Sequence, residues 1–141
     1  MFTEPTHEAV GFTAYAPEGT SYYNYKDIVI FDATVNNIGG YYDTSSSQFL
    51  CPADGMYGFS LNVLTAKGTQ LTGNIMKEST ALASVSGNSI SDVYNGVSNL
   101  VITVCGKGER VWVRCFNDGG ALHGSEGYRY TTFSGFLLNR L

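Results

Sequence analysis

The chain has 141 residues, a length that predicts one domain with a sizeable hydrophobic core. Its net charge is −4 and its eight basic residues are scattered, which argues against sequence-independent binding to nucleic acid or to anionic lipid. Only 14% of the residues are charged and no apolar stretch approaches the roughly 20 residues of a membrane-spanning helix, so we expect no membrane insertion and some apolar surface buried against other copies of the chain.

Short apolar stretches recur between clusters of Gly, Asn, Asp and Ser, and no stretch of a dozen residues shows helical spacing. This pattern predicts an all-β sandwich. The expected strands are Val10–Ala14, Asp27–Phe31, Gly40–Tyr42, Gln48–Leu50, Gly55–Thr65, Thr69–Lys77, Thr80–Ser86, Val97–Cys105, Arg110–Asn117 and Thr131–Asn139.

A four-residue loop at Gly106–Glu109 predicts a hairpin in which Cys105 faces Arg110. One face of that hairpin would be apolar and would hold Leu100, Ile102, Val104, Val111, Val113 and Cys115. Cys105 and Cys115 would then point to opposite faces, so we expect no bridge between them. We expect these two cysteines and Cys51 to be reduced thiols packed as small hydrophobic residues.

The last expected strand is apolar on both faces. Phe133 and Leu137 fall on one face, and Phe136 and Leu138 fall on the other. A strand of this kind is buried on both sides. One side is the core of the sandwich, and a second subunit is the simplest cover for the other.

The spacing of aromatic residues in the first half of the chain resembles the signature of the globular-head family of complement component 1q. The matching residues are Phe31, Asn37, Tyr42, Phe49, Gly55, Tyr57 and Phe59, separated by five, four, six, five, one and one residues. Leu61 stands where the family pattern ends in an aromatic residue. Three more stretches, Val10–Ala14, Gly108–Val113 and Thr132–Leu138, resemble family segments in the same order.

The resemblance implies a ten-strand jelly roll, similar to tumour necrosis factor, that assembles as a homotrimer. Residues 1–8 would be an N-terminal tail, and residues 9–141 would be the globular head. The chain has no collagen-like stalk, so it would be either an excised head or, as we expect, a head-only member of the family. The residues implied to pack the core and the trimer are Phe31, Tyr42, Phe49, Tyr57, Phe59, Phe133, Phe136 and Leu138. Some relatives bridge the cysteine at the position of Cys51 to one about a strand later, and that second cysteine is missing here.

We expect no enzyme. A Ser/His/Asp set can be written from Ser125, His123 and Asp118, but one flexible loop does not easily hold three groups in register.

Two segments are candidate ligand-binding sites. Tyr22, Tyr23 and Tyr25 could stack on a sugar, with polar neighbours bonding to its hydroxyls. The loop 117–127 is the second candidate, through Asn117, Asp118 and His123. Arg129 could pair with the carboxylate of an acidic sugar or with a neighbouring subunit.

Calcium is the one cofactor that the resemblance implies, because some family heads bind it. Asp92 and Asn95 offer oxygen ligands in the corresponding segment. Gly87 stands where a relative would carry aspartate, which puts the site in doubt.

The expected function is that of a secreted, trimeric recognition domain that binds a surface pattern, above all microbial or host carbohydrate, in innate immunity. The residues MFTEPTHE lack the features of a signal peptide, so a secreted protein would have lost its leader. The first rival is a cytokine-like or organiser-like protein ligand for a cell-surface receptor, which should show a larger apolar patch. The second is a domain that assembles extracellular matrix.

Overall fold

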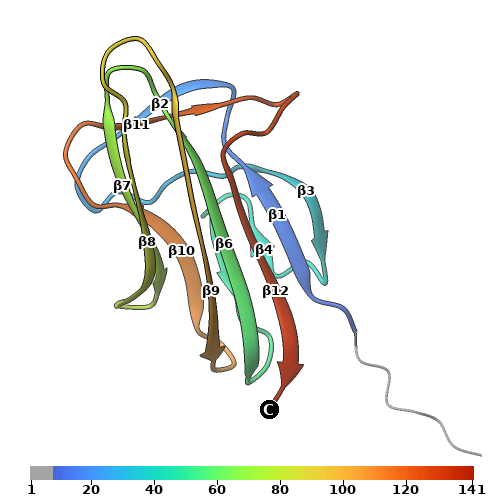
Figure 1. Ribbon diagram of the computed structural model, residues 1–141. Helices are drawn as coiled ribbons and strands as arrows, with labels where there is room; N and C mark the ends of the chain where they lie inside the picture. Colours follow the sequence, from blue (N-terminus) through green and yellow to red (C-terminus); the bar gives the residue numbers. More distant parts are fainter. Residues whose placement is uncertain (1–7) are drawn as a thin grey trace, which may run out of the picture.

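The computed structural model describes residues 8–141, so the predicted tail at 1–8 lies outside the described residues except for Glu8. Within this range no helix has the length and apolar character that crossing a membrane requires. The chain folds into two facing antiparallel sheets (Figure 1). The strands are β1 (Gly11–Tyr15), β2 (Gly19–Tyr23), β3 (Ala33–Ile38), β4 (Tyr42–Asp43), β5 (Gln48–Leu50), β6 (Gly55–Thr65), β7 (Gln70–Lys77), β8 (Thr80–Asn88), β9 (Asn95–Cys105), β10 (Arg110–Cys115), β11 (Gly120–Gly124) and β12 (Thr132–Arg140).

The larger sheet runs β2-β11-β6-β12-β1-β3, with β9 also paired to β6, and the smaller sheet runs β4-β5-β10-β7-β8. Most sheet neighbours are far apart in sequence; β1, for example, pairs with both β12 and β3. This crossing order makes the sandwich a jelly roll, so the predicted all-β jelly roll is confirmed, with twelve strands where ten were expected.

The core lies between the sheets and is rich in aromatic side chains. In β6 the residues at alternate positions, Tyr57, Phe59, Leu61 and Val63, are all buried because they face the smaller sheet. Phe31, Tyr42, Phe49 and Phe133 join them from other segments. These rings make stacked and edge-on contacts with one another, such as Phe12 on Tyr42 at 4.5 Å between centroids.

Three strands were not predicted, and one predicted strand is not formed. β2, β3 and β11 lie in segments rich in polar residues and glycine, where the apolar alternation is weak. Asp27–Phe31 makes one isolated bridge, between Ile28 and Arg114, beside β10.

The predicted hairpin at residues 106–109 is wrong. Val104 pairs with Met56 of β6 in the larger sheet, whereas β10 pairs with β5 and β7 in the smaller one. The loop therefore carries the chain from one sheet to the other. As a result Cys105 and Cys115 both point into the core, and all three cysteines are free and buried.

The solvent-facing side of the larger sheet is apolar, as the closing strand indicated. Phe136 and Leu138 of β12 are 40% and 50% exposed, whereas Phe133 in the same strand is fully buried. Across β6, the neighbouring β9 presents Leu100, Ile102 and Val104, each about half exposed. We call these five residues the apolar face. At its centre the ring of Phe136 lies against Gly58, where an added Cβ would come within 2.7 Å of the ring.

Candidate functional site

The exposed side of the smaller sheet is extended by the segment at residues 26–30, which runs beside β10. Backbone hydrogen bonds fix it there: Lys26 N–H donates to Cys115 O at 2.7 Å, and Val29 N–H donates to Val113 O at 2.8 Å. Val29 points into the core, so the residues on either side of it, Ile28 and Ile30, point outward.

Alternation along β10 places a second row of side chains on the same surface. Val111, Val113 and Cys115 are buried, so Trp112, Arg114 and the following Phe116 face outward. We call the surface formed by Tyr25, Ile28, Ile30, Trp112, Arg114 and Phe116 the outer wall.

Each of two aromatic rings on the outer wall has a positively charged side chain over it. Tyr25 lies 5.0 Å from Phe116 between ring centroids, and the two are 47% and 39% exposed. The guanidinium of Arg114 lies 4.7 Å from the Phe116 centroid, and Lys26 Nζ lies 5.4 Å from that of Tyr25. Each is within the range of a cation–π contact. We call these two exposed rings, together with Arg114 and Lys26 over them, the ledge.

The polar groups around these rings leave the two cations without a carboxylate partner. Asp118 Oδ1 accepts the Tyr25 N–H at 3.1 Å, and Arg114 Nε donates to Asn74 Oδ1 at 2.9 Å. In the described part of the chain the ion pairs are formed by other residues. The arrangement can therefore stack on the apolar face of a sugar ring and offer N–H donors to its hydroxyls or to an acidic group.

Two of the predicted site residues, Tyr23 and Asn117, support the outer wall through hydrogen bonds within the chain. Tyr23 is only 6% exposed; its hydroxyl accepts the Ile30 N–H, and burial raises the pKa of that hydroxyl. Asn117 accepts the Thr72 N–H at 2.8 Å and donates to Gln70 O at 2.9 Å. Their polar groups are therefore used within the chain.

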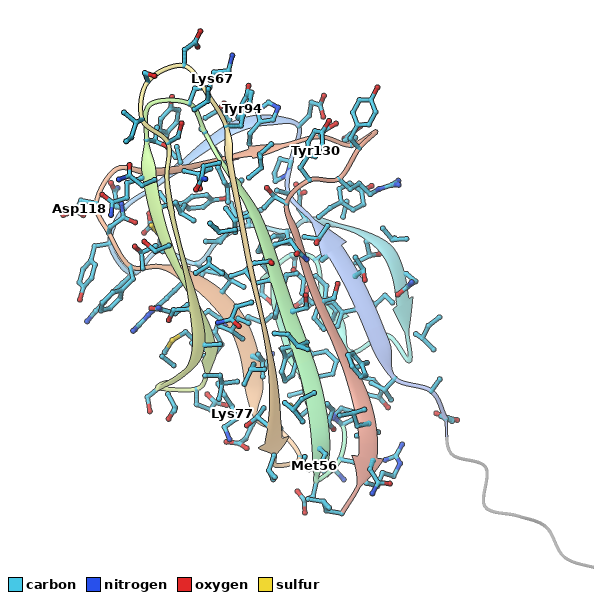
Figure 2. All side chains as sticks on the ribbon, viewed as in Figure 1. Met56, Lys67, Lys77, Tyr94, Asp118 and Tyr130 are labelled. Carbon is cyan, nitrogen blue, oxygen red and sulfur yellow. The ribbon has the colours of Figure 1, made fainter. Side chains whose placement is uncertain are left out.

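His123 lies at the other candidate position, but in strand β11 rather than in a flexible loop, so that expectation was wrong. The His123 ring lies 4.9 Å from the Tyr94 ring between centroids. Lys67 Nζ lies over the Tyr94 ring, 5.0 Å from its centroid (Figure 2). The Ser125 hydroxyl accepts the Tyr128 N–H instead of meeting the imidazole. No Ser/His/Asp arrangement is formed by these residues.

Arg129 and Tyr22 lie apart from the outer wall contacts. The guanidinium of Arg129 lies 4.8 Å from the centroid of the Tyr15 ring, and the rings of its sequence neighbours Tyr128 and Tyr130 stack on each other at 5.7 Å. Tyr22, in strand β2 opposite Ala121, is 72% exposed. Of the predicted ligand-binding residues, Tyr25 and Asp118 thus meet at the outer wall, Tyr23 and Asn117 support that surface, and Tyr22, His123 and Arg129 lie elsewhere.

The residues proposed for calcium do not fit it. The Asp92 carboxylate lies 3.5 Å from Lys67 Nζ, and Asn95 Oδ1 already accepts the Asn88 N–H. Gly87 supplies no carboxylate, and a Cβ there would collide with the Thr65 hydroxyl. Across residues 8–141 no group of three acidic, His or Cys side chains could hold a metal ion. A hard cation needs several converging oxygens without a competing positive charge.

We therefore expect calcium to leave the protein's thermal stability unchanged. Melting curves in millimolar calcium and in excess chelator should coincide, because a ligand that binds the folded state would raise Tm by mass action. A Tm that rises with calcium, and that falls back in an Asp92→Asn variant, would contradict this assignment.

The sequence prediction did not include Phe116, Arg114 or the two isoleucines among the candidate ligand-binding residues. The signal was present, since alternation in the run RVWVRCF places Arg110, Trp112, Arg114 and Phe116 on one face. The contact of that face with Tyr25 depends on the path of the segment 26–30, which no local pattern revealed.

Comparison with known proteins gives a consistent picture. The family model described as "C1q domain" matches residues 11–138. The chain is 35% identical to Caprin-2 of Danio rerio over 111 residues, which is 78% of this chain and 12% of that protein. It is 29% identical to human complement C1q tumor necrosis factor-related protein 3 over 120 residues, 84% of this chain and 48% of that protein. The chain thus spans less than half the length of these relatives.

Solved structures agree on the fold. The globular domain of zebrafish complement 1qA superposes with a TM-score of 0.76 at 20% identity, covering 94% of this chain and 99% of that one. Eiger TNF from S. frugiperda gives a TM-score of 0.79 at 8% identity, with 96% of each chain covered. Murine APRIL gives 0.74 at 15% identity, covering 93% of this chain and all of that one. These proteins belong to a non-catalytic group, so the prediction that the chain is not an enzyme is confirmed.

Proposed function

Because the chain belongs to the C1q domain family, we propose that it is a secreted, homotrimeric recognition domain whose outer wall binds carbohydrate on microbial or host surfaces. Members of the C1q and tumour necrosis factor group typically trimerise and bind receptors or other ligands. A role in innate immunity follows from this class of ligand.

The apolar face supports the trimer. Its five side chains are each between 40% and 57% exposed in the single chain, and they lie on neighbouring strands of one sheet. An exposed apolar surface of this kind is costly in water and is typical of a subunit interface. In the trimer this face is covered, and the outer wall on the opposite side of the sandwich remains in solvent.

The observation that carries the carbohydrate proposal is the pair of exposed rings, Tyr25 and Phe116, with Arg114 and Lys26 over them. Sugars bind through an apolar ring face and a rim of hydroxyls, and this ledge offers a partner for each. A single ledge supplies a weak contact. Three copies in one trimer add avidity without any new contact.

A glycan-array screen of the purified trimer tests the proposal. We expect binding to a defined class of sugars, strongest for acidic ones because the cations on the ledge lack carboxylate partners. Hits are then titrated by calorimetry. A folded trimer that binds no glycan would exclude the carbohydrate proposal.

Replacing Tyr25 by Ala should weaken binding of a glycan hit by about tenfold or more, since roughly 1.4 kcal/mol of lost stacking is a factor of ten. Phe116→Ala should act in the same direction. Tyr128→Ala is the matched control, because Tyr128 is 78% exposed and lies outside the outer wall. Equal affinities of Tyr25→Ala and the wild type in calorimetric titration would place the site elsewhere.

One observation favours a second function, that of a protein ligand for a cell-surface receptor. Ile28 and Ile30 extend the outer wall with aliphatic surface, 39% and 47% exposed, that a sugar would not need. The relatives named as tumour necrosis factor-related or as TNF are consistent with a signalling role of this kind. In that case Ile30→Asp should abolish receptor binding, whereas glycan arrays stay blank.

A further inference from the structure

Two of the three cysteines meet at the lower end of the sandwich, although they belong to opposite sheets. Cys51 directly follows β5 of the smaller sheet, and Cys105 is the last residue of β9 in the larger one. Both are buried, with 1% and 0% exposure. The backbone ties Cys51 to the crossing loop: its N–H donates to Glu109 O at 2.9 Å, and its O accepts the Gly108 N–H at 2.8 Å.

The two thiols belong to the same buried core cluster, and the interaction between their side chains raises the pKa of Cys51 and lowers the pKa of Cys105. Burial adds to the rise at Cys51 and opposes the fall at Cys105. Lys77 stabilises the thiolate form of both residues. Such a pair has one good nucleophile beside a second thiol.

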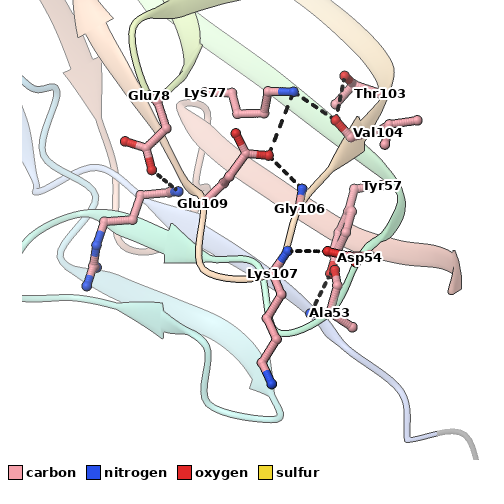
Figure 3. A network of polar contacts seen from close by, with 11 residues as sticks. Ala53, Asp54, Tyr57, Lys77, Glu78, Thr103, Val104, Gly106, Lys107 and Glu109 are labelled. Atoms are coloured by element: carbon pink, nitrogen blue, oxygen red, sulfur yellow. Dashed lines mark hydrogen bonds and ion pairs between the residues drawn. The ribbon is translucent and has the colours of Figure 1, made fainter. Parts of the chain in front are cut away.

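A polar network holds the crossing loop that keeps the two sheets at this separation (Figure 3). Lys77 Nζ donates to Val104 O at 2.9 Å, and Glu109 Oε1 accepts the Gly106 N–H at 2.6 Å. Asp54 Oδ1 accepts the Lys107 N–H at 2.8 Å. The positions of Cys51 and Cys105 beside this loop are therefore fixed by hydrogen bonds from both sheets.

We propose that Cys51 and Cys105 close into an intrachain disulfide that joins the two sheets when the chain folds in the presence of a disulfide oxidant such as glutathione disulfide. The Cys105 thiolate attacks one sulfur of the oxidant and releases one glutathione thiolate. The Cys51 thiolate then attacks the Cys105 sulfur of the mixed disulfide and releases the second. Two protein thiols are oxidised, one glutathione disulfide is reduced to two thiols, and the two protons go to solvent or to the released thiolates.

The third cysteine has a different environment and stays reduced. The Cys115 thiol donates to Asn117 O at 3.1 Å, and burial raises the pKa of Cys115. Its hydrogen-bond partner is thus a carbonyl rather than another thiol. The three cysteines divide into one pair and one isolated residue, so one disulfide can form and one thiol is left over.

Peptide mapping of the wild-type protein tests this directly. Trypsin cuts after Lys and Arg, so each cysteine lies on its own peptide, 27–67, 78–107 or 115–129. The protein is refolded with glutathione disulfide, denatured with an alkylating reagent and digested without reductant. We expect peptide 27–67 linked to 78–107, lost on reduction, and peptide 115–129 alkylated.

Matched variants and a melting curve complete the test. Cys115→Ser should keep the linked peptide, and Cys105→Ser should lose it. Dithiothreitol should lower the Tm of the wild type and of Cys115→Ser by on the order of 10 °C, and should leave Cys105→Ser unchanged. The proposal is overturned if peptides 27–67 and 78–107 are both alkylated after oxidation, if 115–129 is linked in comparable yield, or if reductant leaves the wild-type Tm unchanged.

Discussion

Replacement of Phe133 by Ala should lower the free energy of unfolding by about 4 kcal/mol. Phe133 is fully buried, and its ring meets four others: Phe12 at 5.1 Å, Phe31 at 5.9 Å, Tyr42 at 6.3 Å and Phe59 at 6.3 Å between centroids. The substitution removes buried apolar surface and leaves a cavity that rings from both sheets cannot fill without moving. Denaturant titration at one fixed protein concentration measures the loss.

The control for this substitution is Tyr128→Ala, which removes an aromatic side chain that is 78% exposed. It should change the free energy of unfolding by less than about 0.5 kcal/mol. A loss of less than about 1 kcal/mol in Phe133→Ala would mean that the aromatic core does not hold the sheets together as described.

Replacement of Ile102 by Asp should convert the proposed trimer into monomers. Ile102 lies opposite Gly58 in the middle of the apolar face, so the variant places one unpaired carboxylate per subunit in the interface. An uncompensated buried charge costs several kcal/mol, which moves the dissociation constant by roughly a thousandfold. Light scattering coupled to size exclusion gives the mass of each species.

The chain offers a close control for this change. Ile30 is 47% exposed, as is Ile102, but it lies on the outer wall of the other sheet. Ile30→Asp should therefore remain trimeric. If both variants dissociate, or if neither does, the apolar face is not the subunit interface.

The fold could be predicted because its information is local in the sequence. Alternation in Gly55–Thr65 gives the buried face of β6, and the two apolar faces of Thr132–Arg140 indicate a covered outer side. The resemblance supplied the jelly roll that alternation alone leaves open. The strands that were missed, such as β11 with the sequence GALHG, are polar or glycine-rich and are held by pairing with β2.

The candidate site was harder to predict because it depends on which strands become neighbours. Tyr25 was singled out, but its ring partner Phe116 lies about ninety residues later in the sequence and meets it only through the sheet. Arg114 joins the group through its contact with Phe116. The placement of Cys51 beside the loop that follows Cys105 was hidden for the same reason. A hairpin across residues 106–109 would have kept the crossing loop within one sheet, whereas the chain uses it to connect the two.

Recognition by the outer wall is multivalent only when the apolar face is covered by other copies of this chain. Sedimentation equilibrium of the wild-type protein at micromolar concentration tests this most directly. We predict a single species of three times the 15.2 kDa chain mass. A single species at 15.2 kDa would contradict the trimer, and with it the avidity on which the proposed function rests.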